Sequence, residues 1–321
     1  MKSFHQKFWV VYLFCLVAIG VIGALAWALF SGSQSVKANL VFAAGPEEGI
    51  YFEMAGEMAG ILESKHPDLE IQVLETDGSG ENVRLIETGE ADLALIQNAT
   101  PAGHAVKAIA PTYMEFLHLV ARKEAAIRSW ADLEGKRIFT GPESSGFFRI
   151  VKALLVYFSM LEKVELTSLE YEEARAALLD GEADLFPLMY GFRAPFVRGL
   201  VSQSSDLELL NLSHSDEGAL AGFSSTYPLS RLVSIPPLSY GPEPPEAVHT
   251  IGVETLFVAA EKIPKSSMRL LTETLFRERS QLVKLVPQLS YLSEGFTRDS
   301  LSLPIHDGAS DYYDRNQPGF L

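Results

Sequence analysis

Cysteine is almost absent from this chain of 321 residues, which contains only Cys15. A single cysteine excludes an intramolecular disulfide framework and a metal site built from several thiolates. Positive charge is scarce as well, because 26 Lys and Arg stand against 41 Asp and Glu, for a formal net charge of −15. This balance argues against nucleic acid as a partner and against an anionic membrane surface. It leaves a small-molecule site open, since a local pocket can differ in sign from the whole chain.

Motifs of catalysis and cofactor binding are missing too. The sequence has no Walker phosphate loop, no G-x-S-x-G nucleophile motif and no H-E-x-x-H zinc motif. Its seven histidines are scattered, and none of them pairs with another at ligand spacing. We therefore expect a protein that is not an enzyme and that holds no metal and no cofactor.

Charge disappears altogether from residues 8–30, a run of 23 residues near the N-terminus. As a helix this run is roughly 34 Å long, which is enough to cross a bilayer. Lys2 and Lys7 precede it, which favours an N-terminus inside and the rest of the chain outside. We expect residues 1–38 to form an uncleaved anchor that contacts the lipid bilayer through residues 8–30, on the periplasmic side of a bacterial inner membrane. The alternative is cleavage at "VKA", residues 36–38, which would release a periplasmic protein.

What the sequence does contain is one layout written twice. "GPE" starts at Gly45 and again at Gly141, each time after a short apolar run and before apolar residues at helical spacing. "GEADL" occupies residues 89–93 and again 181–185, which is 92 positions later, each time between a predicted helix and a predicted strand. Chance recurrence is the alternative, but the two motifs recur at nearly equal offsets. Alternating strands and helices predict two α/β lobes of one plan with parallel sheets.

The path of the chain predicts how the lobes are connected. A predicted strand at residues 116–123 leaves the first lobe, and another at residues 249–260 returns to it. We therefore expect lobe 1 to comprise residues 39–123 and 246–321, and lobe 2 to comprise residues 124–245. Ligands of open α/β sheets bind beyond the carboxyl ends of the strands. Two such edges facing one another predict a ligand cleft between the lobes.

Polar side chains at these edges are the first candidates for ligand binding. Ser79 and Asn82 open a predicted helix, where helix capping is the alternative role. Gln97 ends the first GEADL strand, and a buried glutamine there needs polar partners. Ser144 and Ser145 open the first helix of lobe 2, where free N–H groups suit a carboxylate or a phosphate.

Four further residues complete the candidate site. Gly45 lies in the first loop, and Tyr51 and Tyr190 supply apolar walls that also carry a hydroxyl. Arg193, like Arg149, is a candidate counter-charge for an anion. The alternative for each arginine is a surface position, and for each tyrosine a position in the core.

Four segments resemble the TAXI-family solute receptors of TRAP transporters, over about residues 39–315: "AAGPEEGIYFEMAGEMAGIL", "TDGSGENVRLIETGEADLALIQNA", "GPESSGFFRIVKALL" and "LPIHDGASDYYDR". The resemblance implies an α/β, two-lobed periplasmic-binding-protein fold of type II. It also implies capture of a small carboxylate-bearing solute, an amino acid or organic acid, and its delivery to membrane permease subunits. Carried over by position, it implies these binding residues: Tyr51, Ser79, Asn82, Gln97 and Ser145.

Two departures from the family pattern bear on the ligand. Pro46-Glu47-Glu48 stands where the family usually has hydroxyl residues, and Phe147 stands where a small or hydroxyl residue is expected. Acidic residues beside an anion site repel the anion unless they point away, so a more apolar or cationic ligand is also open. The alternative function is a membrane-tethered ligand sensor or interaction protein of the same fold with no transport role. An adjacent permease gene would favour transport.

Overall fold

The computed structural model describes residues 36, 38–47, 49–98, 100–212, 218–227 and 229–315. The predicted anchor at residues 8–30 lies outside these residues. Within them, no helix combines the length and the apolar character that crossing a membrane requires.

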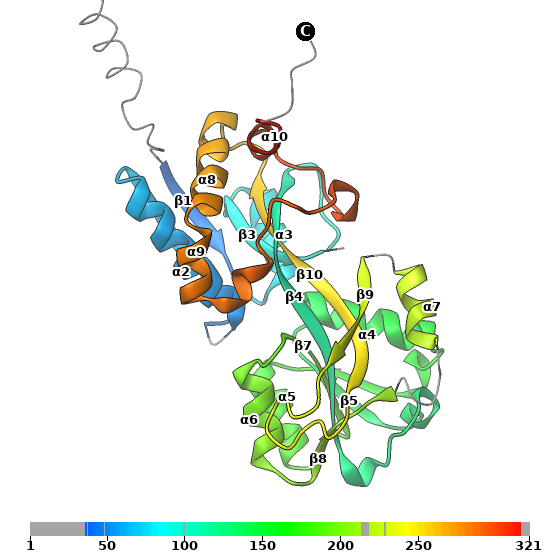
Figure 1. Cartoon of the computed structure of the whole chain (residues 1–321). Coiled ribbons are helices and arrows are strands. Elements are labelled where there is room, and N and C mark those ends of the chain that lie inside the picture. The colour runs from blue at the N-terminus through cyan, green and yellow to red at the C-terminus, as the bar shows by residue number, and fades with distance from the viewer. Residues whose placement is uncertain are drawn as a thin grey trace, which may run out of the picture.

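Two α/β lobes share one ten-stranded sheet (Figure 1). The strand order is β2-β1-β3-β10-β4-β7-β5-β6, with β8 beside β4 and β9 beside β10. The two middle strands, β4 (Val106–Arg122) and β10 (Val248–Ala260), are antiparallel and run from one lobe into the other. We call them the hinge strands, because strands that continue from one packed lobe into the other are where a hinge motion would occur. The predicted two-lobed α/β fold is confirmed, but the prediction of parallel sheets is wrong in part, because the antiparallel hinge strands join the parallel strands of both lobes into one mixed sheet.

Each lobe contains the same five-element unit. In lobe 1 the unit is β1 (Ala38–Ala43), α2 (Ile50–Lys65), β2 (Leu69–Leu74), α3 (Ser79–Thr88) and β3 (Leu93–Gln97). In lobe 2 it is β5 (Arg137–Thr140), α4 (Gly146–Tyr157), β6 (Glu165–Ser168), α5 (Tyr171–Leu179) and β7 (Leu185–Gly191). The first strand of each unit lies parallel between the other two. The layout predicted from the repeated motifs is thus present in both lobes.

The remaining elements complete the two lobes. Lobe 2 adds α6 (Pro195–Gln203), β8 (Leu207–Leu209), α7 (Ala219–Thr226) and β9 (Ser230–Ile235). Lobe 1 adds α8 (Lys265–Arg277), α9 (Arg279–Leu285) and α10 (Asp307–Tyr313) after the second hinge strand. Short 3-10 turns lie at Lys123–Ala125, Trp130–Leu133, Leu161–Lys163, Pro287–Tyr291 and Arg298–Ser300.

The GEADL motif has one structural role in both lobes. Gly89 and Gly181 have φ angles of 82° and 80°, the left-handed conformation that favours glycine just after a helix. The aspartates of the motif, Asp92 and Asp184, accept hydrogen bonds from a backbone N–H of the neighbouring strand at 3.0 and 2.9 Å. The motif therefore ends a helix and fixes the start of one strand against the next, which accounts for its recurrence.

The hydrophobic core is divided between the lobes, and the division lies within the hinge strands. Along β4, Tyr113 packs in a lobe 1 cluster whereas Met114 packs in the lobe 2 cluster. Along β10, Val253 packs in lobe 2 and Leu256 in lobe 1. The domain boundaries expected after residue 123 and before residue 246 stay a proposal. The change from lobe 1 packing to lobe 2 packing lies at residues 113–114 of β4 and 253–256 of β10, within the ranges expected for lobe 1.

Candidate functional site

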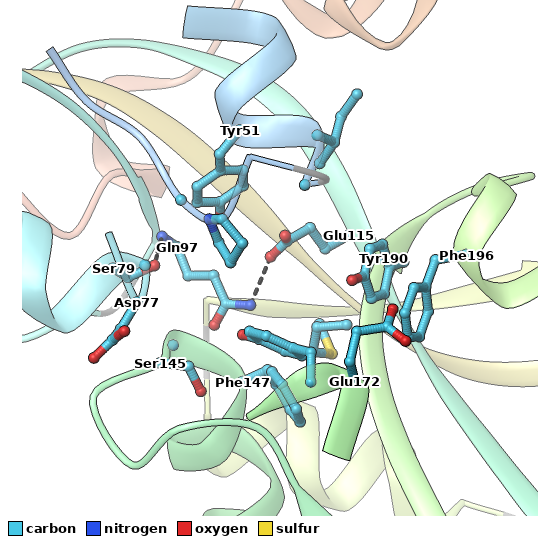
Figure 2. Close-up of a pocket in the computed structure, with 18 residues that line it drawn as sticks. Tyr51, Asp77, Ser79, Gln97, Glu115, Ser145, Phe147, Glu172, Tyr190 and Phe196 are labelled. Carbon is cyan, nitrogen blue, oxygen red and sulfur yellow. Dashed lines mark hydrogen bonds between the residues drawn. The ribbon is translucent and has the colours of Figure 1, made fainter. Parts of the chain in front are cut away.

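A cavity of about 100 Å³ lies between the lobes beside the hinge strands (Figure 2). The starts of helices α2, α3, α4 and α5 meet there with the ends of strands β3 and β7. The lining residues are Gly45, Pro46, Gly49, Ile50, Tyr51, Asp77, Gly78, Ser79 and Gln97 of lobe 1, Glu115 of β4, and Ser145, Gly146, Phe147, Tyr171, Glu172, Met189, Tyr190 and Phe196 of lobe 2. The cavity thus lies where the carboxyl ends of the strands in both lobes converge, as the edge rule for α/β sheets predicts.

A buried carboxyl and a buried amide lie at the centre of this cavity. Gln97 Nε2 donates a hydrogen bond of 2.6 Å to Glu115 Oε2 (Figure 2). Glu115 is only 5% exposed. Burial raises the pKa of Glu115 to about 8, and hydrogen bonds from Gln97 and Tyr51 oppose this rise. At neutral pH the carboxyl is therefore held mainly in its protonated form, and a nearby positive charge would ionise it.

The wall on the lobe 1 side is fixed by hydrogen bonds between elements. The hydroxyl groups of Tyr51 and Thr255 are 2.9 Å apart, which ties α2 to the hinge strand β10. Ser79 Oγ accepts a hydrogen bond of 2.9 Å from the backbone N–H of Gln97, which ties α3 to β3. Burial raises the pKa of Tyr51 well above its usual value, so this phenol stays neutral.

Aromatic rings dominate the wall on the lobe 2 side. Tyr190 and Phe196 stack with their ring centroids 5.2 Å apart, and Phe147 lies 5.5 Å from Tyr171. Ser145 is the N-cap of α4, and its Oγ accepts a 3.2 Å hydrogen bond from a backbone N–H of the first turn. This wall offers several ring faces and one helix N-terminus to a ligand.

The lobes contact each other at one side of the cavity. Gly80 N–H donates to the carbonyl of Ser144 at 3.0 Å, and Ser144 Oγ donates to Asp77 at 3.1 Å. Arg149 donates to Thr100 Oγ1 at 2.8 Å across the same boundary. These hydrogen bonds, which we call the interlobe contacts, hold the two lobes together over the cavity.

Glycine is required where the lobes approach most closely. A Cβ atom on Gly146 would lie 2.5 Å from Gln97 Oε1 and 2.9 Å from Ser79 Oγ. A Cβ atom on Gly80 would overlap the carbonyl oxygen of Ser144, a backbone atom that cannot move without its helix. A side chain at Gly80 would hold the lobes apart, whereas one at Gly146 would require the side chains of Gln97 and Ser79 to shift.

Six of the nine residues predicted to bind a ligand line the cavity: Gly45, Tyr51, Ser79, Gln97, Ser145 and Tyr190. Their positions come from two lobes and from segments far apart in the sequence. That they contact a solute stays a prediction.

The other three predicted residues lie elsewhere. Asn82 is fully buried behind the wall, where its side chain bonds a threonine hydroxyl at 2.6 Å and two backbone carbonyls at 2.6 and 2.7 Å. Because these hydrogen bonds occupy both the oxygen and the nitrogen of its amide, Asn82 supports the wall from behind. Ser144 takes part in the interlobe contacts instead of lining the cavity. Arg193 points its guanidinium over the exposed ring of Phe192, 5.2 Å from the centroid, so it supplies no counter-charge to the cavity.

The sequence interpretation missed Glu115, although the sequence carries a signal for it. Glu115 is the only formally charged residue between Lys107 and Arg122, in a stretch that is otherwise mostly apolar. A lone carboxyl in such a stretch has to find polar partners in the interior. Tyr171, Glu172 and Phe196 were missed without any comparable signal.

Among the described residues that line the cavity there is no lysine, arginine or histidine. In the part of the chain that the structure describes, no three His, Cys, Asp or Glu side chains gather in a way that could hold a metal ion. The expectation of a protein without metal or cofactor stays a prediction.

Comparison with known proteins places the chain in a family. Residues 42–315 match the NMT1-like family. The chain belongs to this family. Since the match spans both lobes and the hinge strands, the cavity lies wholly within the NMT1-like region.

Solved structures are similar to this NMT1-like chain in fold. The amino acid ABC transporter substrate-binding protein AbpA from Streptococcus pneumoniae, bound to L-arginine, has a TM-score of 0.50 at 15% identity, over 79% of this chain and 96% of that one. The alkanesulfonate-binding protein SsuA from Xanthomonas axonopodis pv. citri, bound to MOPS, gives 0.49 at 15%, over 88% and 86%. The reduced form of the regulatory domain of OxyR2 from Vibrio vulnificus gives 0.46 at 11%, over 79% and 98%. The likeness to AbpA supports a periplasmic-binding-protein-like fold.

Proposed function

We propose that this chain is an extracytoplasmic solute receptor. It binds a small solute in the cavity between its lobes and delivers it to a membrane permease. The observation that carries the proposal is the cavity itself, which is lined from both lobes and lies beside the hinge strands. In such a site, opening the hinge separates the two walls, and a solute that touches both favours the closed form.

The chemistry of the lining supports binding without turnover. None of the histidines that the structure describes lines the cavity. The Ser79 and Ser145 hydroxyl oxygens accept hydrogen bonds from backbone N–H groups, and among the described residues neither hydroxyl is bonded to a carboxylate, lysine or histidine that could act as a general base. Glu115 has an amide and a tyrosine as its hydrogen-bonding partners. Such groups can recognise a ligand, but they lack the nucleophile–base arrangement of a hydrolase.

We extend the proposal to a TRAP-type system, on the strength of the four segments that resemble TAXI-family receptors. In this proposal, residues 8–30 anchor the protein in the bilayer and the lobes lie on the periplasmic side of the inner membrane. Cleavage at residues 36–38, which leaves a free periplasmic receptor, is the alternative.

The solute in this proposal is a small amino acid rather than an organic acid. Gly146 and Phe147 of the first turn of α4 line the cavity, and a helix N-terminus favours a carboxylate. A solute with carboxylates alone would face Asp77, Glu115 and Glu172 without a basic side chain to pair with. An ammonium group on the same solute removes this conflict.

Native mass spectrometry of the full chain, purified without added solute from the cells that express it, tests the receptor proposal. We expect one small molecule per chain, and we expect uptake of that molecule to fall when the gene is deleted. A bound molecule whose uptake does not change would contradict transport and favour the tethered sensor. A chain that carries no molecule and binds none would contradict both.

A further inference from the structure

We propose that the solute of this cavity carries a positively charged nitrogen group, which lies beside Glu115 and against the aromatic rings of the walls. This inference rests on the proposed receptor function and specifies the chemical class of its ligand.

The charged side chains that line the cavity are acidic, and the buried one, Glu115, has no cationic partner among the described residues. Glu172 forms an ion pair of 2.6 Å with Arg175, which does not itself line the cavity. Asp77 lies at the exposed rim and accepts a hydrogen bond from Ser144. Glu115 is buried and forms no ion pair with any described residue. A buried carboxylate that lacks a cation is costly, so this position invites one from a ligand.

The hinge strands carry two carboxylates, Glu115 and Glu254, that differ in their partners. Glu115 on β4 lies opposite Val253 on β10, and the next pair in the register is Met114 with Glu254. Because successive side chains of a strand point to opposite faces, Glu254 lies on the far side of the sheet from Glu115. There Glu254 pairs with Arg231 at 2.9 Å. Glu254 therefore has a cationic partner within the chain, whereas Glu115 faces the cavity and has none among the described residues.

The described groups that interact with Glu115 are neutral. Gln97 of β3 donates to it, and three tyrosines face it from α2, β4 and α5, namely Tyr51, Tyr113 and Tyr171. Burial raises the pKa of each of these phenols, so none ionises near neutral pH. A cation bound next to Glu115 would therefore draw its compensating charge from Glu115 itself, and a proton would leave this carboxyl as the cation binds.

The aromatic walls suit the same kind of ligand. Tyr51 comes from lobe 1, and the stacked pair of Tyr190 and Phe196 comes from lobe 2, close to Glu115 (Figure 2). The face of an aromatic ring attracts ammonium and quaternary nitrogen groups, most strongly when water is excluded. A carboxylate at the centre and ring faces on both lobes together recognise a nitrogen cation.

A second use of Glu115 has a different signature. The protonated carboxyl can donate a hydrogen bond to a carbonyl or carboxylate of a ligand. Glu115→Gln keeps a hydrogen-bond donor but cannot ionise, so it would preserve binding of that kind and weaken the binding of a cation.

Isothermal titration calorimetry on the full chain tests the inference. The probes are choline, putrescine and L-arginine as nitrogen cations, with succinate and ethanesulfonate as anions. We expect a cation to bind and both anions to fail. We expect Glu115→Gln to lower the affinity for that cation by about 30-fold or more, as for other buried charge pairs. Glu254→Gln is the matched control, and it should change the affinity by less than about threefold because Glu254 lies on the far face.

Titrations at pH 7 in buffers of different ionisation enthalpy give a second readout. Binding of the cation should release a proton in the parent chain and none in Glu115→Gln. Equal affinity of the cation for the parent and for Glu115→Gln would overturn the inference.

The remaining outcomes separate this inference from the receptor proposal. Binding of an anion but of no cation would overturn the inference and leave the receptor in place. If no probe binds, the solute found by native mass spectrometry decides, since a solute without a cationic nitrogen also overturns the inference. A chain with no solute and no probe bound would overturn the receptor proposal and this inference with it.

Discussion

Gly80→Ala should loosen the closed form of the protein without harming its fold. Gly80 lies in the first turn of α3, and its backbone N–H donates to the Ser144 carbonyl across the lobe boundary. A methyl group there would overlap that carbonyl oxygen. The lobes must separate to accommodate it, and this breaks the bonds of Ser144 with Gly80 and Asp77.

The size of the effect follows from those two hydrogen bonds. Each contributes about 0.5–1.5 kcal/mol net, so the closed form loses about 1–3 kcal/mol relative to the open form. This changes the ratio of closed to open molecules by about 5- to 150-fold. Alanine in a helix also stabilises the fold by about 0.5–1 kcal/mol relative to glycine, so the melting temperature should not fall.

Distances between two spin labels measure this ratio. The labels go on cysteines at the exposed positions Glu70 in lobe 1 and Glu162 in lobe 2, with Cys15→Ser to remove the native thiol. Gly56→Ala is the matched control, because Gly56 is also a helical glycine but lies at an exposed position where a Cβ meets nothing within 4 Å. We expect longer distances for Gly80→Ala and parent-like distances for Gly56→Ala. Identical distance distributions in the two variants would refute the role of the interlobe contacts.

Three further variants test the energetics of the fold and the site. Glu115→Gln should stabilise the chain by roughly 3 kcal/mol at pH 7 and by little near pH 4.5. The folded parent keeps the proton of this carboxyl up to about pH 8, whereas the unfolded chain releases it at lower pH, so the parent loses stability as the pH rises. Thermal unfolding from pH 4.5 to 8 measures the gap, and a constant gap would contradict the burial argument. Asn82→Leu should cost about 2–4 kcal/mol in urea unfolding, because it removes the amide that donates to two buried carbonyls. A smaller cost would contradict the supporting role of Asn82. Burial alone would raise the pKa of Asp184, but hydrogen bonds from Arg137 outweigh burial and lower it. Asp184→Asn should therefore lower the free energy of unfolding by about 1 kcal/mol at neutral pH and not at all in acid, where Asp184 of the parent is protonated too. Glu182→Gln, at an exposed position of the same motif, is its control and should change the stability at neutral pH by less than about 0.5 kcal/mol.

The duplicated plan of the fold was predictable because its determinants are local. A left-handed glycine after a helix and an aspartate that bonds the adjacent strand leave a short, readable motif, here GEADL. The position of the cavity was predictable for a related reason, since loops that follow strands of a parallel sheet gather at one edge. Tyr51, Ser79, Gln97 and Ser145 lie at such places.

The charge of the cavity was not predictable from the same signals. Whether an arginine side chain reaches the cavity depends on loop geometry that no local motif encodes. Arg193, a candidate counter-charge, lies over the ring of Phe192 and not at the cavity. Glu115 belongs to a hinge strand whose face is set by pairing with β10, a segment more than a hundred residues away. Aromatic residues such as Tyr171 and Phe196 read as core in the sequence, and only the assembled lobes turn them toward the cavity.

A crystal structure of the full chain, purified without added solute from its own cells, would show whether the cavity between the lobes binds a solute. We expect difference density for a small molecule between the lobes, in contact with Glu115 and Tyr190, with Gly80 still bonded to Ser144. A solute bound outside the cavity, or a cavity that holds only water in a preparation shown by mass spectrometry to carry a solute, would contradict it.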